Sequence, residues 1–320
     1  MSFFKNNKKR IIIIILIIIL LLILFGVIFM IKVMLNLQEA AKESYQPSDK
    51  DRHQNIQIKS KNDKNLSFLI LGLDKKDSGT QRTDSIIVAT YNVKNNKIMM
   101  TRIPRDLYIE TGNYKGKINA LYESQGLSKT INFIQDYTGV PISHYTTTDF
   151  NGLTKLIDHV GGIDIDSKIK IDDSNNSNLG GNIYVKKGKN HLNGREALGY
   201  SRIRYVDNDI ERGNRQMEVV NALIKKLTSK SQLTSVDSNI KYMSKYVKTD
   251  MKISTAIDYA LNLDSTPEIK HINFKWDQFN NDGEDFVTIS NDERYKISKE
   301  LRANLELHQN TPLIPIKTKP

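Results

Sequence analysis

The sequence predicts a layered α/β domain with a mixed sheet, because short apolar runs alternate with amphipathic segments along most of the chain. Two apolar runs, 67–73 and 85–91, are rich in leucine or β-branched residues and predict buried strands. Apolar residues at helical spacing, as at Leu153, Leu156, Ile157 and Val160, predict helices that each bury one face.

Three further segments complete the predicted strands. The run 97–103 follows Asn95-Asn96, a pair typical of turns, so residues 85–103 are predicted to form a hairpin. Short strands are also expected at 163–165 and 271–276, and an Asp/Asn/Ser/Gly-rich loop at 172–182.

The predicted helices fill most of the remaining chain. A Gly161-Gly162 pair ends one of them, since glycine readily adopts the conformation that follows a helix. The expected helical ranges are 119–125, 129–137, 149–160, 193–200, 209–227, 232–262 and 292–307.

The N-terminus predicts a membrane anchor. Residues 11–31 are apolar throughout, long enough to cross a hydrocarbon core of about 30 Å. Four basic residues precede this run, which places the N-terminus in the cytosol and the rest outside. A cleaved signal peptide is disfavoured because the run is too long and no small-x-small cleavage site follows. The predicted divisions are a cytoplasmic tail 1–10, a transmembrane helix 11–35, an extracytoplasmic stalk 36–64, a catalytic domain 65–310 and a tail 311–320.

Composition limits the chemistry. The chain of 320 residues has a formal charge of +11, so a polyanionic partner is expected. A domain outside the cell is expected to meet phosphate-rich glycans or lipid headgroups, and nucleic acid is not expected. The absence of cysteine excludes disulfides and thiol catalysis, and six scattered histidines show no zinc-ligand spacing.

Arginine and aspartate residues gather at the predicted strand ends and loops. Arg202 and Arg204 would share a face if their segment were extended. Arg212, Arg215 and Gln216 share a helix face near its N-terminus, where an anion is favoured. Because the arginine fork matches phosphate oxygens, the stretch 200–216 predicts an anion site. The alternative is a solvated basic face with surface ion pairs.

Two carboxylates suggest a metal. Asp74 and Asp84 are ten residues apart around a polar loop, and oxygen ligands without histidine or cysteine suit a hard cation such as Mg²⁺. The alternative is that each carboxylate only caps backbone N–H groups in a turn. There is no phosphate-binding Gly-rich loop of the Walker type and no Gly-x-Ser-x-Gly elbow.

At these positions the sequence resembles the LytR-CpsA-Psr family of Gram-positive cell-envelope phosphotransferases. The similar stretches follow the family's order over roughly residues 66–230: 68–74 (FLILGLD), 81–86 (QRTDSI), 102–106 (RIPRD), 117–120 (KINA), 160–163 (VGGI), 192–198 (LNGREAL), 200–204 (YSRIR) and 212–216 (RGNRQ). Arg102 is a departure, since the family often has a small residue there. The C-terminal 90 or so residues carry little signature.

The resemblance implies a three-layer α/β/α sandwich with a central mixed sheet that binds a polyprenyl pyrophosphate, its lipid in an apolar tunnel. It implies Asp74 and Asp84 as ligands of Mg²⁺ (or Mn²⁺). We assign Arg105, Asp106, Arg202 and Arg204 to catalysis, with Asp106 either orienting Arg105 or assisting proton removal. Pyrophosphate contacts are assigned to Arg82, Lys117, Arg212, Arg215 and Gln216.

The expected reaction moves a phosphate-linked glycopolymer, such as teichoic acid or capsule, from undecaprenyl pyrophosphate to peptidoglycan. The enzyme would be a single-pass type II protein of the cell membrane with its catalytic domain outside. Two alternatives stay open: a non-catalytic or regulatory binder of anionic wall polymers or polyprenyl lipid, and a lipid pyrophosphatase that uses water. A transcriptional regulator is disfavoured, because only ten residues would face the cytosol.

Overall fold

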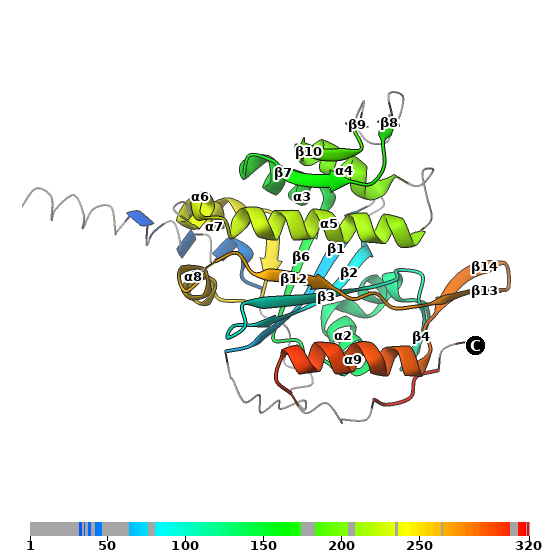
Figure 1. Cartoon of the computed structure of the whole chain (residues 1–320). Coiled ribbons are helices and arrows are strands. Elements are labelled where there is room, and N and C mark those ends of the chain that lie inside the picture. The colour runs from blue at the N-terminus through cyan, green and yellow to red at the C-terminus, as the bar shows by residue number, and fades with distance from the viewer. Residues whose placement is uncertain are drawn as a thin grey trace, which may run out of the picture.

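A computed structural model describes the folded part of the chain (Figure 1). The described residues are 32–33, 35, 38–39, 42–46, 64–75, 81–173, 183–203, 209–233, 236–263, 265–307, 313–317 and 319. Residues 11–31, which make up most of the predicted transmembrane helix 11–35, and Arg204 lie outside them. Within the described ranges, no helix has both the length and the apolar character needed to cross a membrane.

The core of the fold is a six-stranded sheet with the order β11-β6-β1-β2-β3-β12. β2 runs antiparallel to β1 and β3, whereas β6 is parallel to β1 and β12 is parallel to β3, so the predicted mixed sheet is confirmed. The strands are β1 (Leu66–Lys75), β2 (Gln81–Asn92), β3 (Lys97–Ile103), β6 (His144–Asp149), β11 (Val247–Thr249) and β12 (Glu268–His271).

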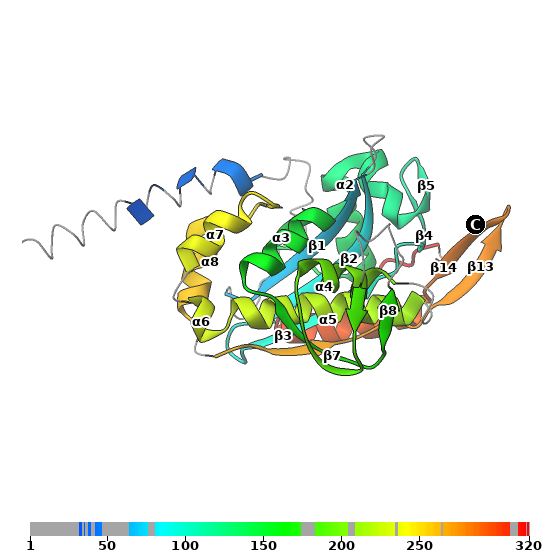
Figure 2. The same cartoon turned by 90° about the horizontal axis from the view of Figure 1, so that it is seen from above.

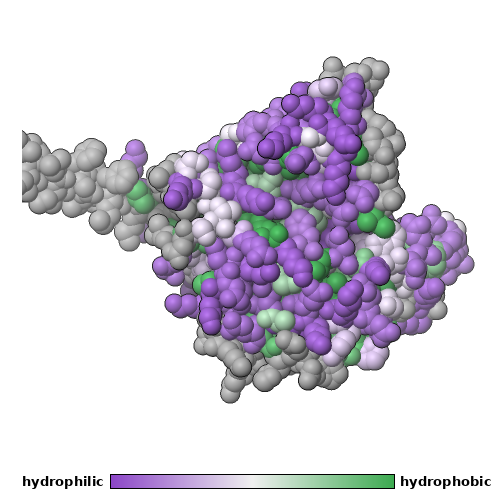
Figure 3. All heavy atoms as spheres, viewed as in Figure 1, coloured by the Kyte–Doolittle hydropathy of each residue, from purple (hydrophilic) through white to green (hydrophobic). Residues whose placement is uncertain are grey.

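Alternating side chains send the sheet's apolar residues to two different cores. Leu69, Leu71 and Val88 face the core beneath α2 (Leu121–Thr138) and α9 (Asn291–Asn304). Ile87 and Met100 face α5 (Asp209–Leu227) on the other side. Helices therefore cover both faces of the sheet, with α2 and α9 below it and α5 above it in Figure 1. The face in Figure 3 is mainly hydrophilic, with apolar residues only in small patches.

A third core lies beyond α5. It joins α3 (Phe150–His159) and α4 (Gly194–Arg202) to two short ribbons. The first ribbon pairs β7 (Ile163–Ser167) with β10 (Gly188–Leu192), and the second pairs β8 (Ile171–Asp173) with β9 (Ile183–Val185).

The two ends of the molecule differ in structure (Figures 1 and 2). One end gathers α6 (Lys230–Leu233), α7 (Val236–Met243) and α8 (Ile253–Leu261), next to the described part of residues 32–46. The opposite end carries a projecting hairpin, β13 (Asp277–Asn281) and β14 (Glu284–Thr288). Near it lie β4 (Tyr108–Thr111), β5 (Tyr114–Lys117) and the 3-10 turn η1 (Ile118–Ala120).

Several sequence-based boundaries were wrong. The predicted helix 232–262 is divided into α6, α7 and α8, with strand β11 pairing to β6 between α7 and α8. The predicted strand 271–276 is wrong beyond His271, where β12 ends. The two helices predicted at 119–125 and 129–137, in contrast, are confirmed as the two parts of α2, which a kink at Gly126 separates, where φ is +79°. The β2–β3 hairpin is confirmed.

Candidate functional site

The candidate site lies at one edge of the sheet. β1, β3 and β6 end at this edge and β2 begins there, because β2 is antiparallel to its neighbours. Asp74 is at the end of β1, opposite Arg82 of β2. Arg105 follows the end of β3. Asp149, the last residue of β6, is opposite Leu73 of β1. Charged residues from separate motifs are therefore brought to one place.

A β-bulge sets the position of Asp84. Gly72 is opposite Ser85 but Leu73 is opposite Thr83, so Asp84 is the extra residue of β2. The bulge lets Thr83 share the α2 side of the sheet with Leu73. There its buried hydroxyl donates a hydrogen bond to the Asn119 carbonyl at 3.2 Å. Asp84 thereby leaves the regular pairing at the edge where Arg105 lies.

Four predicted site residues form one ion network. Arg105 lies between two carboxylates, with Nη1 3.3 Å from Oδ2 of Asp84 and Nε 3.4 Å from Oδ2 of Asp106. Lys117 Nζ is 3.7 Å from Oδ1 of Asp106 and 3.0 Å from Oε1 of Glu284 on β14. These contacts hold Arg105 from two sides, which would preorient a phosphate-binding fork. Glu284 was missed in the sequence, since nothing there links it to residues 167 or more positions away.

The backbone also fixes this network. The Asn119 N–H donates to the Arg105 carbonyl at 3.1 Å, and the Val287 N–H of β14 donates to the Asp106 carbonyl at 2.9 Å. The KINA and RIPRD segments are therefore held together by main-chain bonds, which makes the spacing of Arg105, Asp106 and Lys117 a property of the fold.

Arg202 reaches the same edge from a helix. The expectation of an extended segment is wrong at Arg202, which lies in the last turn of α4. An Asn193–Glu196 capping box starts this helix and satisfies its first N–H groups. The Arg202 guanidinium lies 4.5 Å from the ring centroid of Phe150, the residue that follows Asp149. Phe150 thus fixes Arg202 beside the end of β6.

Arg215 is largely a structural arginine. It is 4% exposed, and its Nε and Nη2 donate to the carbonyls of Tyr200 and Ile203 at 2.8 and 2.7 Å. It therefore fastens α5 to the end of α4. Burial, followed by a hydrogen bond to Glu218, raises the pKa of Tyr200, which remains a neutral donor.

Two other predicted pyrophosphate contacts on α5, Arg212 and Gln216, lie within three residues of Arg215. Arg212 is 5% exposed. Gln216 has a buried Oε1 that accepts no hydrogen bond from the residues the structure describes. A buried amide oxygen without a donor is costly, so Gln216 fits a place beside a ligand.

Arg102, the departure from the family pattern, packs beneath α5. A Cβ on Gly213 would stand 2.1 Å from Cζ of Arg102, so the guanidinium lies directly against the helix. Arg102 is opposite Ile87, whose side chain belongs to the α5-facing core. Arg102 therefore lies on the α5 face of the sheet, one residue before the end of β3.

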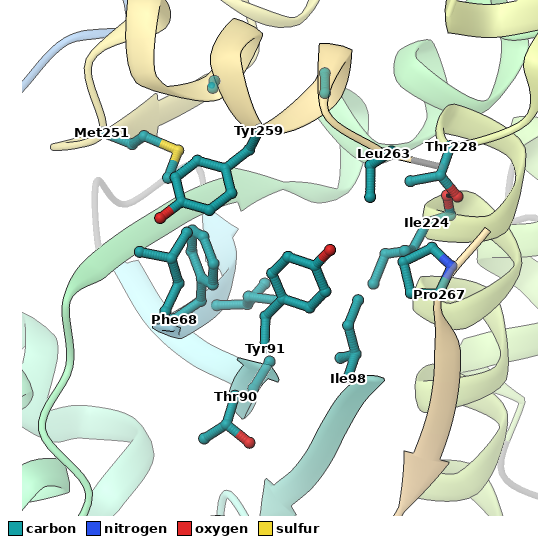
Figure 4. Close-up of a pocket in the computed structure, with 15 residues that line it drawn as sticks. Phe68, Thr90, Tyr91, Ile98, Ile224, Thr228, Met251, Tyr259, Leu263 and Pro267 are labelled. Carbon is teal, nitrogen blue, oxygen red and sulfur yellow. Dashed lines mark hydrogen bonds between the residues drawn. The ribbon is translucent and has the colours of Figure 1, made fainter. Parts of the chain in front are cut away.

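An apolar cavity of about 320 Å³ occupies the same face farther along the strands (Figure 4). Phe68, Tyr91 and Ile98 line it from the sheet, Ile224 from α5, and Tyr259 from α8. Cavities of this size hold small-molecule ligands. At 1.5 Å per residue, Ile224 lies about 18 Å along α5 from Arg212. The cavity and the charged edge are thus joined by one helix.

The donors suit a magnesium ion that shares its coordination with a ligand. Asp74 and Asp84 supply two carboxylates, and the described residues hold no group of three or more His, Cys, Asp or Glu that could bind a metal alone. Mg²⁺ commonly takes one or two protein carboxylates together with substrate phosphates. The residues present therefore fit a cation that arrives with a phosphate.

These features define an α/β protein in which a charged site and a ligand-sized apolar cavity lie along one helix, α5. A family model described as the LytR_cpsA_psr family matches residues 31–303. The chain belongs to the LytR-CpsA-Psr family, which confirms the resemblance read from its motifs.

Characterised relatives include an enzyme of Bacillus subtilis. The polyisoprenyl-teichoic acid–peptidoglycan teichoic acid transferase TagV is 35% identical over 228 residues, which are 68% of this chain and 58% of the relative's own length. The crystal structure of B. subtilis TagV matches with a TM-score of 0.68 at 30% identity, covering 77% of this chain and 99% of that one.

A more distant neighbour supports the fold. TagT (YwtF) of B. subtilis, solved with bound octaprenyl pyrophosphate lipid, matches with a TM-score of 0.64. The two chains are 23% identical, and the match covers 82% of this chain and 99% of that one.

Proposed function

We propose that this chain transfers a phosphate-linked glycopolymer from an undecaprenyl-pyrophosphate carrier to peptidoglycan. The observation that carries the proposal is the Asp84–Arg105–Asp106–Lys117 network at one end of α5, with an apolar cavity at the other end. A polyprenyl pyrophosphate has the same division into a charged head and an apolar tail. The names of TagV and of lipid-bound TagT support this choice of donor.

The prenyl chain would occupy the cavity, and the pyrophosphate would lie among the arginines. Arg105, held by Asp84 and Asp106, would bind phosphate oxygens, with Arg82, Lys117, Arg202, Arg204, Arg212, Arg215 and Gln216 as further contacts. Of these, Arg215 already uses two of its nitrogens on carbonyls, so it would act mainly by holding α4 and α5 in place.

The proposed transfer needs no nucleophile from the protein. A sugar hydroxyl of peptidoglycan would attack the phosphorus attached to the glycan. A new P–O bond to that sugar forms, the bridging P–O bond breaks, and undecaprenyl phosphate leaves with the bond's electrons. Asp106 would accept the hydroxyl proton or keep Arg105 in position. Positioning and charge stabilisation carry most phosphoryl transfers, so a site built from arginines needs no covalent catalysis by the protein.

Mg²⁺ (or Mn²⁺), held by Asp74 and Asp84, would neutralise charge on the phosphate oxygens when bound. The chain would work as a single-pass type II membrane protein with residues 65–310 outside the cell, because the carrier lipid is confined to the membrane. This placement rests on the apolar run 11–31.

The test is a reconstituted reaction of the full chain with a lipid-pyrophosphate-linked glycan, with and without peptidoglycan. Transfer that depends on the acceptor supports the proposal. Release of glycan phosphate without acceptor indicates a pyrophosphatase, and binding without turnover indicates a regulatory binder.

Two variants sharpen the test. Arg105→Ala should lower turnover by about 10²–10³-fold, the usual effect of removing one group that stabilises transition-state charge. Arg105→Lys should also be poor, because an ammonium cannot contact both carboxylates and a phosphate in one plane. Lys97→Ala, which removes an ion pair with the exposed Glu268 far from this network, is the control. Unchanged turnover in Arg105→Ala would reject the site assignment.

A further inference from the structure

The end of the domain that carries α8 differs from the rest of the surface. Ile253, Ala256, Ile257, Tyr259 and Ala260 make α8 an apolar helix, yet none of its described side chains is fully buried. A helix with this composition normally buries its apolar face against a core. The apolar side chains of α8 are therefore partly accessible, and a further apolar contact would bury them.

One face of α8 closes the apolar cavity. Ala256, Tyr259, Ala260 and Leu263 line the cavity and follow the i, i+3, i+4, i+7 spacing of one helix face. In Figure 4, Tyr259 hangs from α8 across from Phe68 and Tyr91 of the sheet. Ile253 and Ile257 lie on a neighbouring stripe that does not line the cavity. α8 therefore separates the cavity from the exterior, and it is apolar on more than its inner side.

The chain enters the domain at this same end. Tyr45 forms a bridge with Thr249 of β11, and the Gln46 N–H donates to the Thr249 carbonyl at 2.9 Å. Tyr145 OH donates to the Gln46 carbonyl at 2.6 Å. Ser244, after α7, donates to the Glu43 carboxylate at 3.2 Å. Residues 43–46 of the predicted stalk are thus fixed to β11 and the end of α7.

These contacts limit the distance between the domain and the apolar run. Eleven residues, 32–42, lie between Ile31, the last of the apolar run, and Glu43. One of them, Glu39, pairs with Lys241 of α7 at 3.0 Å. Because the segment that docks on α7 follows the apolar run so closely, the neighbouring α8 must lie close to the structure in which that run is embedded. Both cartoon views place the described part of residues 32–46 beside α7.

Charge at this end matches an anionic surface. Residues 225–252 contain seven lysines and two aspartates. One of the aspartates, Asp250, is turned inward, where it accepts a hydrogen bond from the Tyr145 N–H at 2.9 Å. Lys230, Lys245 and Lys252 are exposed on α6, after α7 and before α8. Lysines around a half-exposed apolar helix are the pattern of an interfacial membrane contact.

We propose that the α6–α8 end of the domain rests on an anionic lipid bilayer, with α8 at the boundary between headgroups and acyl chains. The cavity behind α8 would then open toward the bilayer, so that a carrier lipid passes beneath the helix without crossing water. The identity of that lipid rests on the proposed function; the bilayer contact rests on α8, the docked residues 43–46 and the lysines.

The test uses the full chain in nanodiscs. Because the chain has no cysteine, Ser254→Cys, exposed on α8, can carry one environment-sensitive fluorophore. Gln278→Cys, exposed on the hairpin at the opposite end, is the control position. Nitroxide-labelled lipids should quench the label at 254 several-fold more than the label at 278. Lys252→Cys, at the N-cap of α8, provides a second position should the first disturb the helix.

Lipid charge provides an independent readout. Quenching at 254 should be stronger in phosphatidylglycerol nanodiscs than in phosphatidylcholine ones, and Lys230→Glu with Lys245→Glu should remove that difference. Equal quenching at 254 and 278, or a chain that does not enter nanodiscs, would overturn the proposal.

This outcome is separable from that of the reaction. The fluorescence needs no donor lipid, and Arg105→Ala should leave it unchanged. Strong quenching at 254 in a protein without transfer activity would reject the proposed function and leave the bilayer contact standing.

Discussion

Arg102 and Gly213 form a close contact between β3 and α5, since any side chain at 213 would meet the Arg102 guanidinium at 2.1 Å. A glycine inside a helix destabilises it by about 1 kcal/mol relative to alanine. Here the glycine makes room for a cation between the apolar cavity and the charged edge. We therefore expect Arg102 to serve the pyrophosphate end of the ligand.

Gly213→Ala should displace Arg102 and lower transfer by about tenfold, the loss of one charge-assisted contact. Arg102→Ser, which restores the small residue usual in the family, should show a similar loss. In the double variant, Gly213→Ala should have no further effect on turnover, because the space is empty, and should raise the thermal midpoint. Initial rates and melting curves of the four proteins measure this. Additive losses would show that the two residues act separately.

Replacing Arg215 should affect stability more than ligand binding alone. Arg215→Met keeps an apolar stem but leaves the carbonyls of Tyr200 and Ile203 without their donors. We expect the free energy of unfolding to fall by about 3 kcal/mol, the usual scale for losing two hydrogen bonds to a charged group. Urea unfolding measures the change. Arg195→Met, exposed in the first turn of α4, should change it by no more than about 0.5 kcal/mol. A native-like unfolding curve for Arg215→Met would mean that its role is confined to the ligand.

Filling the cavity should block the lipid tail. Ala260→Phe adds a ring to a residue that lines the cavity, so binding of a prenyl pyrophosphate should fall about tenfold or more, since bulk in an apolar pocket displaces ligand carbon atoms. Binding of a short water-soluble pyrophosphate should be unaffected. Ala303→Phe, exposed on α9, is the control. Both affinities can be measured by calorimetry. Equal prenyl affinity in the two variants would place the tail elsewhere.

His191 should make a pH-dependent contribution to stability. Its Nδ1 lies 2.7 Å from Asp164 Oδ1 and its Nε2 2.8 Å from the Gly161 carbonyl, so both nitrogens can donate in the charged form. The hydrogen bond to Asp164, and then that to Gly161, raise the pKa of His191 above its ordinary value of 6.5. This stabilisation is complete below the unfolded-state pKa and is lost as pH rises through the folded-state pKa.

His191→Gln should therefore destabilise the protein more at pH 6 than at pH 9. Both side chains of the pair are exposed, at 57% and 82%, so the difference should stay below about 1 kcal/mol. Urea unfolding at the two pH values gives the comparison. An identical effect at both pH values would show that the imidazolium is not the stabilising form.

The pattern of apolar residues predicted β1, β2 and β3 but missed β6, β11 and the β13–β14 hairpin. β1, β2 and β3 are evident because their β-branched and aliphatic runs are mostly buried. β6 (HYTTTD) was missed since its residues are mostly polar, and only pairing with β1 makes it a strand. β11 has three residues and exists through its bonds to β6. The hairpin β13–β14 is polar on its outer side and gives little periodic signal.

The residues of the candidate site were likewise predicted in part and missed in part. Asp84, Arg105, Asp106 and Lys117 were chosen from motifs, and the structure brings them into contact. Their partner Glu284 is distant in sequence and exposed, so no local pattern indicates it. Arg202 lies at the same edge of the sheet, but in the last turn of α4 and not in an extended segment, because α4 continues two residues beyond its predicted end at 200. The catalytic and binding roles of all the assigned residues, including Asp74, Arg82, Arg204, Arg212 and Gln216, stay predictions.

The extra residue in β2 has a consequence for how the chain tolerates change. From Asn92 back to Ser85, the side chains of β2 alternate regularly between the two faces of the sheet. Thr83 reaches the α2 side only because Asp84 interrupts this alternation. Deleting Asp84 would leave Thr83 in place yet remove a carboxylate, whereas adding a second residue would turn Thr83 and its hydroxyl to the opposite side. An insertion here should thus be more damaging than most substitutions of the same strand, whereas the deletion should cost mainly the carboxylate.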